Sequence, residues 1–374
     1  MQYTEYELGE LLPFEQPTAY IVKSTDYSDA YATPVLTAGK SFILGKTNET
    51  DGIFDQLPVI IFDDFTTATQ FVNFRFKVKS SAMKILHINT DLVIPKYIFY
   101  RLQIIQFDHS THKRYWIQSY SKIKVLIPSL DEQSRIVAHI EELFSELDKA
   151  VGTLKTTKEQ LEVYRQAVLK DAFSDFEKKD SIRNLTMVVT SGSRGWAKYY
   201  SNSGALFVRI GNLTHSGIDI DFRDIQHITP PDNAEGVRTR LQPNDVLVSI
   251  TADLGSIGFV SEKVEEAYIN QHIALVRFQN PVQGRFMAWY LRSEYGQKDL
   301  LKNKRGGGKL GLGLDDIRDT PVPIVSDLVA QKTVDEIEER LSVCDSIEKT
   351  VDAALAQADA MRQSILKQAF EGAL

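Results

Sequence analysis

Two long stretches of the chain repeat apolar side chains at alternating steps of four and three residues. Sustained over about four heptads, this spacing predicts long helices that each pack an apolar stripe against a partner helix. The stripe of the first helix comprises Ile136, Ile140, Leu143, Leu147, Ala150, Leu154, Leu161, Tyr164 and Val168, and that of the second comprises Ile337, Cys344, Ile347, Val351, Ala354, Ala358, Met361 and Ile365.

The two stretches are copies of one another. Displacing the first by 197 residues aligns them without a gap from His139 onward, so that residues 165–170 fall on residues 362–367. A repeat of this length is strong evidence of architecture. The simplest partner for each stripe is the other copy, and two such helices in one chain would have to run antiparallel. The alternatives are that each helix packs onto its own domain or pairs with a second chain.

The segments outside the helices predict two mixed domains dominated by strands. Apolar runs at 59–62 and 246–250 are typical of buried strands, and helices are expected at 97–105 and 286–291. The strands lie 187 residues apart and the helices 189, so the repeat extends weakly into the domains. We predict an α/β (α+β) fold with a pseudo-twofold internal repeat. Its parts are a domain over 1–128, a helix over 129–176, a domain over 177–325 and a helix over 326–374.

Charge is distributed unevenly along the chain, although the net charge is only −7. The two helical stretches together sum to −9, and everything else sums to +2. Residues 65–127 carry 10 basic and 2 acidic side chains, and residues 277–309 carry 8 and 2. Local charge steers a polyanion more than the total does. Each predicted domain therefore has a basic stretch suited to nucleic acid.

These basic stretches also contain aromatic and amide side chains. Lys and Arg hold phosphates, whereas Arg, Asn and Gln can read base edges. Alternation around residues 73–79 predicts that Arg75, Lys77 and Lys79 point outward. For any one cluster taken alone, the alternative is an ordinary solvated basic face. The candidate DNA contacts are Arg75, Lys77, Lys79, His112, Lys113, Arg114, Tyr115, Arg209, Asn212, Gln271, Lys302, Lys304, Arg305 and Lys309.

Motifs for catalysis or cofactor binding do not emerge from the sequence. Lys309 follows a glycine run, but Leu310 stands where a phosphate-binding loop needs Ser or Thr. His109 and His112 are spaced like metal ligands but lack a cysteine pair to complete a site. There is no nucleophile elbow and no dinucleotide fingerprint. We expect a chain with no catalytic residues, no metal and no bound cofactor.

The sequence also bears on location. No apolar run approaches the roughly 18 residues of a membrane span, and the N-terminus lacks the basic start and apolar core of a signal peptide. The single cysteine, Cys344, cannot form an internal disulfide and fits the apolar stripe. We expect a cytoplasmic protein that does not enter the membrane.

Several segments resemble the specificity subunit of type I restriction-modification systems. They are residues 34–37, 62–65, 124–133 with 136–137, 207–212, 244–247, 270–272 and 320–323 with Gln331. The resemblance covers essentially the whole chain. It departs at residues 326–330, where Ser-Asp-Leu-Val-Ala replaces a compact Leu-Asp-Glu-Gln pattern, and in the short lead-in before Leu8.

The resemblance implies that each domain is a target-recognition domain that reads one half of a split, asymmetric site in double-stranded DNA. The helices would set the unread spacer and dock two modification subunits. Those subunits would bring S-adenosylmethionine and methylate adenine N6, and restriction subunits using ATP and Mg would cut unmodified DNA. Residues expected in helix pairing and partner docking are Ile140, Leu147, Leu154, Leu161, Ile337, Ile347, Val351 and Ile365.

Three other functions remain open at this point. The chain could be the specificity subunit of a combined methyltransferase-nuclease system, which sequence separates poorly from the first interpretation. It could be a coiled-coil scaffold that binds only protein. An enzyme in its own right is the third alternative, and the missing catalytic motifs disfavour it.

Overall fold

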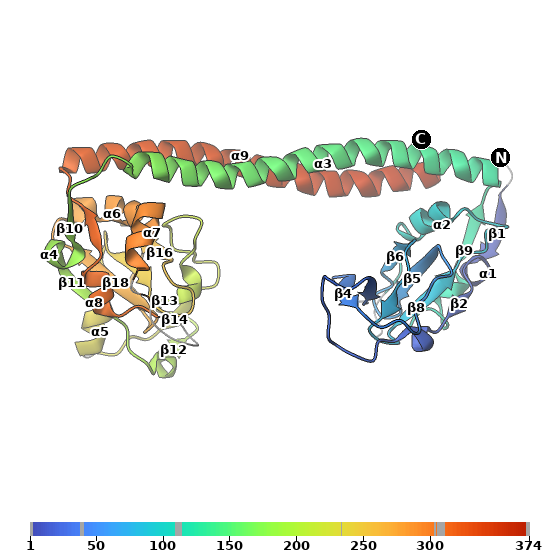
Figure 1. Cartoon of the computed structure of the whole chain (residues 1–374), viewed down its shortest axis with the longest axis horizontal. Helices are drawn as coiled ribbons and strands as arrows, with labels where there is room; N and C mark the ends of the chain where they lie inside the picture. Colours follow the sequence, from blue (N-terminus) through green and yellow to red (C-terminus); the bar gives the residue numbers. More distant parts are fainter. Residues whose placement is uncertain are drawn as a thin grey trace. The chain divides into compact units, whose positions relative to one another are not determined.

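The computed structural model describes residues 3–37, 41–108, 114–232, 234–302, 304 and 311–371. The chain divides into two units. The first comprises Met1–Leu154 and Ala353–Leu374, and the second comprises Lys155–Asp352. Each unit combines one domain with a section of both long helices, α3 (Leu130–Phe173) and α9 (Asp327–Glu371) (Figure 1). Among the described residues, no helix combines the length and apolarity needed to span a bilayer.

The domain of the first unit contains three sheets. A four-stranded antiparallel sheet has the order β2-β8-β5-β6, a three-stranded sheet has the order β4-β3-β7, and β1 pairs with β9. Strand β3 runs parallel to β7 and antiparallel to β4. The strands are β1 (Thr4–Glu7), β2 (Phe14–Glu15), β3 (Thr33–Leu36), β4 (Ile43–Thr47), β5 (Val59–Asp63), β6 (Thr69–Val72), β7 (Lys77–Val78), β8 (Met83–His87) and β9 (Lys124–Ile127), and the α-helices are α1 (Leu8–Leu11) and α2 (Pro95–Leu102).

The domain of the second unit is built in the same way with more elements. Its sheets have the orders β11-β18-β15-β16, β12-β14-β13-β17 and β10-β19. The strands are β10 (Lys179–Ser181), β11 (Thr186–Ser191), β12 (Tyr200–Ser201), β13 (Ala205–Val208), β14 (Gln226–Ile228), β15 (Val246–Ser249), β16 (Ile257–Phe259), β17 (Ala267–Ile269), β18 (Ile273–Phe278) and β19 (Pro321–Pro323), and the α-helices are α4 (Ile182–Leu185), α5 (Ala234–Thr239), α6 (Gly284–Arg292), α7 (Glu294–Leu300) and α8 (Leu314–Arg318).

The two domains share one sheet plan. Strands β5 and β15 occupy the same position in their four-stranded sheets, and the parallel pair β3·β7 corresponds to β13·β17. Helices α2 and α6 follow those sheets at corresponding places in the chain. The predicted extension of the repeat into the domains is therefore confirmed.

The long helices pair antiparallel in each unit. In the second unit, Arg165 of α3 lies 2.6 Å from Asp345 of α9, and Lys158 lies 2.8 Å from Asp352. In the first unit, Arg362 of α9 is ion-paired with Asp148 of α3. Partner numbers fall along α9 as they rise along α3, which is the signature of antiparallel packing. The predicted intramolecular pair is thus present.

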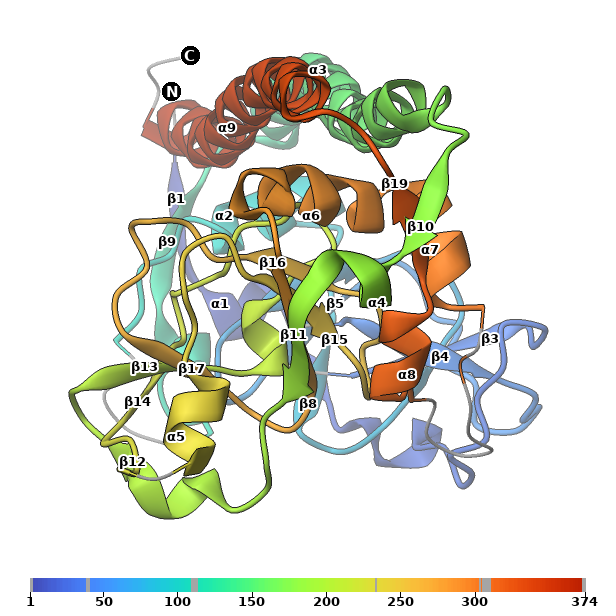
Figure 2. The same cartoon turned by 90° about the vertical axis from the view of Figure 1, so that its left-hand side faces the viewer.

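Both helices also pack onto the domains, which partly confirms the alternative that each helix packs onto its own domain. In the second unit, Phe173 of α3 and Ile337 of α9 belong to the same buried cluster as Phe286 of α6. Figure 2 shows α6 lying between this helix pair and the strands β15 and β16. In the first unit, Ile140 and Leu366 pack near Tyr100 of α2.

Most of the predicted apolar stripe is buried or half-buried, but two of its positions in α9 are displaced by one residue. Ile140 and Ile337 are fully buried, Leu161 and Val351 nearly so, and Leu147, Leu154 and Ile365 are half-buried. Ile347, however, is 41% exposed, so its predicted role in pairing is wrong.

The displacement has a physical reason. The helix-facing position next to Ile347 is Glu348, which lies 2.9 Å from Arg165. Met361 is likewise exposed, while its neighbour Arg362 pairs with Asp148. Polar residues thus occupy several positions between the helices and are satisfied by ion pairs. A pattern that looks for apolar residues therefore selects the neighbouring positions, Ile347 and Met361, in place of Glu348 and Arg362.

Candidate nucleic-acid interface

The turn between β17 and β18 joins the two large sheets of the second unit. The backbone N–H of Asn270 donates to the carbonyl of Val208 at the end of β13 (3.3 Å). The N–H of Ile250, directly after β15, donates to the carbonyl of His272 (2.9 Å). The turn therefore brings the ends of β13 and β15 together, and several predicted DNA contacts lie on either side of it.

One side of the turn borders a surface pocket of about 650 Å³ lined by Arg209, Asn212 and Asn270. Asn212 is 4% exposed. Its Oδ1 accepts from the N–H of Arg209 (2.8 Å), and its Nδ2 donates to the carbonyls of Asp221 (2.8 Å) and Asp224 (3.1 Å). Its amide is therefore committed to holding the loop, which contradicts the prediction that Asn212 contacts DNA. Arg209 remains partly exposed at the rim of this pocket.

On the other side, Gln271 is held by its neighbour. Its Nε2 lies 2.8 Å from His272 Nε2, and His272 Nδ1 lies 2.5 Å from Thr251 Oγ1. Since an amide nitrogen can only donate, His272 Nε2 accepts and Nδ1 carries the proton that bonds Thr251. His272 thus orients a candidate base-reading amide; the sequence singles out residues 270–272 but predicts no role for His272.

The residues that follow the basic segment 302–310 in the chain lie beside the same turn. Leu312 donates its N–H to the carbonyl of Ile250 (2.9 Å), and Gly311 forms a β-bridge with Thr251. Lys302 and Lys304 are exposed, and Arg305 and Lys309 lie outside the described residues. The structure therefore brings the far end of this loop next to the Gln271 segment.

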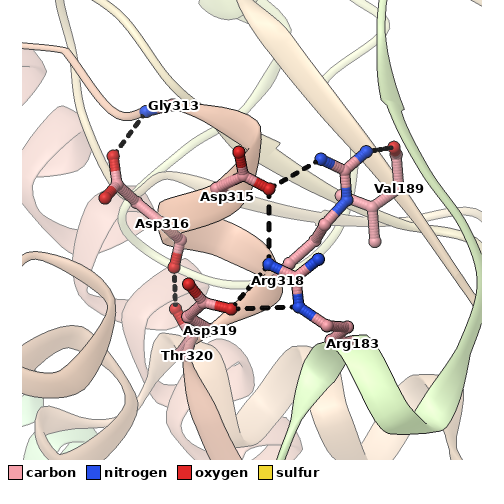
Figure 3. Close-up of polar contacts among 8 residues, drawn as sticks. All are labelled: Arg183, Val189, Gly313, Asp315, Asp316, Arg318, Asp319 and Thr320. Carbon is pink, nitrogen blue, oxygen red and sulfur yellow. Dashed lines mark hydrogen bonds and ion pairs between the residues drawn. The ribbon is translucent and has the colours of Figure 1, made fainter.

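Helix α8 fixes that end of the loop to the body of the domain (Figure 3). Asp316 Oδ2 accepts from the N–H of Gly313 (2.8 Å), and Arg318 Nη2 donates to the carbonyl of Val189 in β11 (2.8 Å). Arg183 of α4 bridges Asp319 (2.7 Å) and Asp315 (3.3 Å). These contacts hold the end of the loop in place against β11 and α4.

The basic segment of the first unit returns to the equivalent place. Tyr115 donates its N–H to the carbonyl of Asp64 (3.0 Å), and Trp116 donates to Asp64 Oδ1 (2.9 Å). Asp64 follows β5 as Ile250 follows β15, and its own N–H donates to Ala82 in the β7–β8 turn (3.3 Å). In both units, then, a basic loop ends beside the residue that follows the central strand.

Two predicted contacts of the first unit are buried. Tyr115 is 5% exposed and packs its ring 5.0 Å from that of Phe107. Lys77 is 2% exposed, with its Nζ donating to the carbonyl of Asp51 (2.5 Å) and lying 3.2 Å from Glu49. The prediction that Lys77 points outward is wrong, because β7 is covered on both faces.

The other predicted contacts of the first unit divide into two groups. Arg75, Lys79 and Arg114 are exposed, and Lys79 lies over the ring of Tyr27 (5.8 Å). His112 and Lys113 lie outside the described residues. The exposed side chains are free to rotate toward a ligand in a way that Lys77 is not.

One polar cluster in the second unit superficially resembles a catalytic triad. His215 Nε2 lies 2.7 Å from Asp253 Oδ1 and 3.0 Å from Ser256 Oγ. The hydrogen bond from His215 lowers the pKa of the Asp253 carboxyl. A triad needs the carboxylate and the nucleophile on different ring nitrogens, whereas here both contact Nε2. The cluster holds the loop after β15 and is not arranged for nucleophilic catalysis.

No family model matches the chain. It is 45% identical over 174 residues to the type I restriction enzyme EcoR124I/EcoR124II specificity subunit of Escherichia coli, a match that covers 43% of each chain. It is 29% identical over 283 residues to the type I restriction enzyme StySPI specificity subunit of Salmonella potsdam, covering 68% of this chain and 58% of that protein. The proteins that the chain resembles over these stretches are specificity subunits of type I restriction enzymes. These matches span between 43% and 58% of the relatives' own length.

A solved structure supports the fold of the chain. It is described as "Structural basis underlying complex assembly and conformational transition of the type I R-M system", and it matches with a TM-score of 0.71 at 17% identity. The match covers 100% of this chain and 98% of that one. The predicted fold class, two mixed domains with two long paired helices, is confirmed.

Gly192 offers a test of the turn between β17 and β18. A Cβ there would lie 2.4 Å from both the carbonyl carbon of Asn270 and the carbonyl oxygen of Ile269. Gly192→Ala should therefore displace the turn, cost about 1–3 kcal/mol of unfolding free energy and weaken DNA binding. Urea unfolding and a mobility shift would measure the two effects. Gly217→Ala is the matched control, since its Cβ would enter open space; equal behaviour of the two variants would contradict the prediction.

Proposed function

We propose that this chain is the DNA-recognition component of a type I restriction-modification complex and has no catalytic centre of its own. Each domain would read one half of a split target in double-stranded DNA. The paired helices would set the spacer between the halves and dock two modification subunits. Those subunits would supply S-adenosylmethionine and methylate adenine N6, and the restriction subunits would use ATP and Mg.

The observation that carries this proposal is the duplicated arrangement of the basic loops. Tyr115 and Leu312, which follow the basic segments 109–114 and 302–310 in the chain, each donate an N–H to the residue that follows a central strand, β5 or β15. Two positively charged loops at equivalent places suit two phosphate-backbone contacts of the same kind. The side chains around them differ between the units. Two domains with different recognition side chains favour a target whose two halves differ in sequence.

The individual contacts remain predictions of different strength. The best candidates are cationic side chains that are exposed or partly exposed, together with the Gln271 amide that His272 orients. The cations are Arg75, Lys79, Arg114, Arg209, Lys302 and Lys304. His112, Lys113, Arg305 and Lys309 are retained on sequence alone. Phosphate contacts should add affinity for any DNA, and Gln271 should add preference for one base.

Reconstitution tests the proposed function directly. The chain would be expressed with the modification subunit encoded beside it, and DNA methylated in the cell would be sequenced. We expect N6-methyladenine in a bipartite, asymmetric motif. A scaffold that binds only protein would give a stable complex with no DNA shift and no methylated motif, and that result would overturn the proposal.

Single charge removals should identify the phosphate contacts. Lys113→Ala, Lys304→Ala and Arg305→Ala should each weaken DNA binding and lower the slope of log K against log salt by about 1. The measurement is a binding isotherm at four salt concentrations. Lys332→Ala, an exposed lysine of α9, is the control and should leave the slope unchanged. A variant with an unaltered slope would exclude that residue as a phosphate contact.

A further inference from the structure

The turn that carries Gln271 has its backbone held on both sides of that residue. Asn270 is only 8% exposed, and its Oδ1 accepts from the N–H of His272 (3.0 Å). The carbonyl of Asn270 accepts from the N–H of Ile273 (3.3 Å). The carbonyl of His272 accepts from the N–H of Ile250, which follows β15 (2.9 Å). Because these bonds hold the main chain, the conformational freedom of Gln271 is that of its side chain.

One contact fixes the orientation of the Gln271 amide. Its Nε2 donates to Nε2 of His272 (2.8 Å), which uses one of the two amide hydrogens. The groups that remain are the second N–H, a donor, and Oε1, an acceptor. Gln271 is partly exposed. A ligand at this surface would therefore meet a donor and an acceptor in a fixed order, with the donor nearer to His272.

His272 is itself held by the turn that follows β15. Its Nδ1 lies 2.5 Å from Oγ1 of Thr251. The next residue, Ala252, has a φ of +60°, a conformation that residues other than glycine adopt only when their surroundings impose it. Asp253 in the same turn is bonded to His215 (2.7 Å). The imidazole ring of His272 therefore contacts a constrained part of the fold.

The order of donor and acceptor on an amide decides which purine it fits. In the major groove adenine presents its N6 amino group, a donor, beside N7, an acceptor, whereas guanine presents two acceptors, O6 and N7. On a duplex held in one position, an amide oxygen directed at the 6-position accepts from N6 of adenine and is repelled by O6 of guanine. The same amide turned over directs its nitrogen there, donates to O6 of guanine and is repelled by N6 of adenine. The contact that fixes the amide thus fixes the preferred purine.

We infer that His272 is a positioning residue that sets Gln271 to read adenine. The inference rests on the proposed function, in which the second domain reads one half of a DNA target. An acceptor at His272 Nε2 keeps the amide nitrogen of Gln271 toward the ring, so the amide oxygen lies on the far side, where it would accept from N6 of adenine. Base preference would then depend on the hydrogen-bonding character of residue 272 as well as on the glutamine.

Side chains that only accept or only donate at position 272 test this inference. His272→Glu keeps an acceptor beside the amide nitrogen, His272→Lys supplies only donors, and His272→Ala supplies neither. Each full-length variant would be expressed with the modification subunit, and the methylated DNA of the cell would be sequenced. Gln271→Ala identifies the position that Gln271 reads, because base preference is lost at that position.

At that position, the wild type and His272→Glu should select adenine over guanine by about tenfold. The preference should fall to near equality in His272→Ala, because a free amide can turn to suit either purine, and should reverse in His272→Lys. His272→Ala makes the smaller structural change and decides the test where the longer lysine impairs folding. Adenine selected as strongly by His272→Ala as by the wild type would overturn the inference, as would a Gln271→Ala variant that keeps every preference.

Controls separate base reading from charge and from folding. His227→Glu and His227→Lys make the same charge changes at a ring that lies 3.1 Å from the carbonyl of Gly204, and should leave every base preference unaltered. A changed preference in them would attribute the effect to charge and contradict the inference. The half-site read by the first domain should remain in every methylated motif and so report folding. A wild-type complex that methylates no motif would refute the proposed function itself, whereas the outcomes above leave that function standing.

Discussion

A chain shortened by seven residues in both long helices is expected to direct the proposed modification subunits to a target with unchanged half-sites and a spacer shorter by about three base pairs. Seven residues shorten a helix by about 10 Å at 1.5 Å per residue, and each base pair spans about 3.4 Å. Seven residues make about two turns of a paired helix, so their removal keeps the same face of each helix toward its partner. Methylome sequencing would reveal the new spacer.

The structure indicates where the residues should be removed. Deleting 153–159 and 350–356 takes equivalent pieces from the two copies. Lys158 and its partner Asp352 leave together, and Glu348, which also lies 3.7 Å from Lys158, keeps its ion pair with Arg165. The Arg165–Asp345 and Arg362–Asp148 pairs, one in each unit, remain.

The control deletes 153–159 from α3 alone. The two helices then differ in length between the retained ion pairs, so we expect loss of folding or of methylation in place of a shortened spacer. Insertion of seven residues at both sites should lengthen the spacer by a similar amount. An unchanged spacer in the double deletion would contradict the role of the helices as a ruler.

Heptad spacing predicted the long helices and their pairing because alternating steps of four and three residues have few other structural solutions. It misplaced Ile347 and Met361, which are exposed, because Glu348 and Arg362 occupy the neighbouring positions that face the other helix. A polar side chain between helices is tolerated when an oppositely charged partner lies within reach. That partner is on the other helix, about 180 residues away in sequence, and single-sequence periodicity cannot detect it.

Charge clustering located the basic loops but could not decide which cations face solvent. Lys77 and Lys79 are two residues apart in one alternating stretch, which places them on the same side of an ideal strand. In the structure, β7 contains only Lys77 and Val78, and Lys79 lies beyond its end. Lys77 is buried because Glu49 and Asp51 come from a separate loop to satisfy its ammonium group. Such a contact depends on tertiary structure, which local pattern does not encode.

The largest effect on stability is expected from Lys84→Met. Lys84 of β8 lies 3.2 Å from Asp64, and the two side chains are only 1% and 2% exposed. Methionine keeps the length of the side chain but leaves a buried carboxylate without its cation, which typically costs about 3–5 kcal/mol. Hydrogen exchange of the full-length chain should show faster exchange in β5 and residues 115–120, and unaltered exchange in β15. The control variant Lys79→Met, which replaces an exposed lysine, should leave hydrogen exchange unchanged in β5, in residues 115–120 and in β15.

A second substitution separates the ion pair from simple packing. Asp64→Asn keeps the acceptor oxygen for the N–H of Trp116 and removes the buried charge. Because a neutral pair no longer needs a counterion, the Lys84→Met, Asp64→Asn double variant should recover most of the protection that Lys84→Met loses. If the double variant is instead as unstable as the sum of the single variants, the loss comes from packing. Asp64 would then anchor residues 115 and 116 through its two hydrogen bonds alone, since its backbone carbonyl accepts from Tyr115 and its Oδ1 accepts from Trp116.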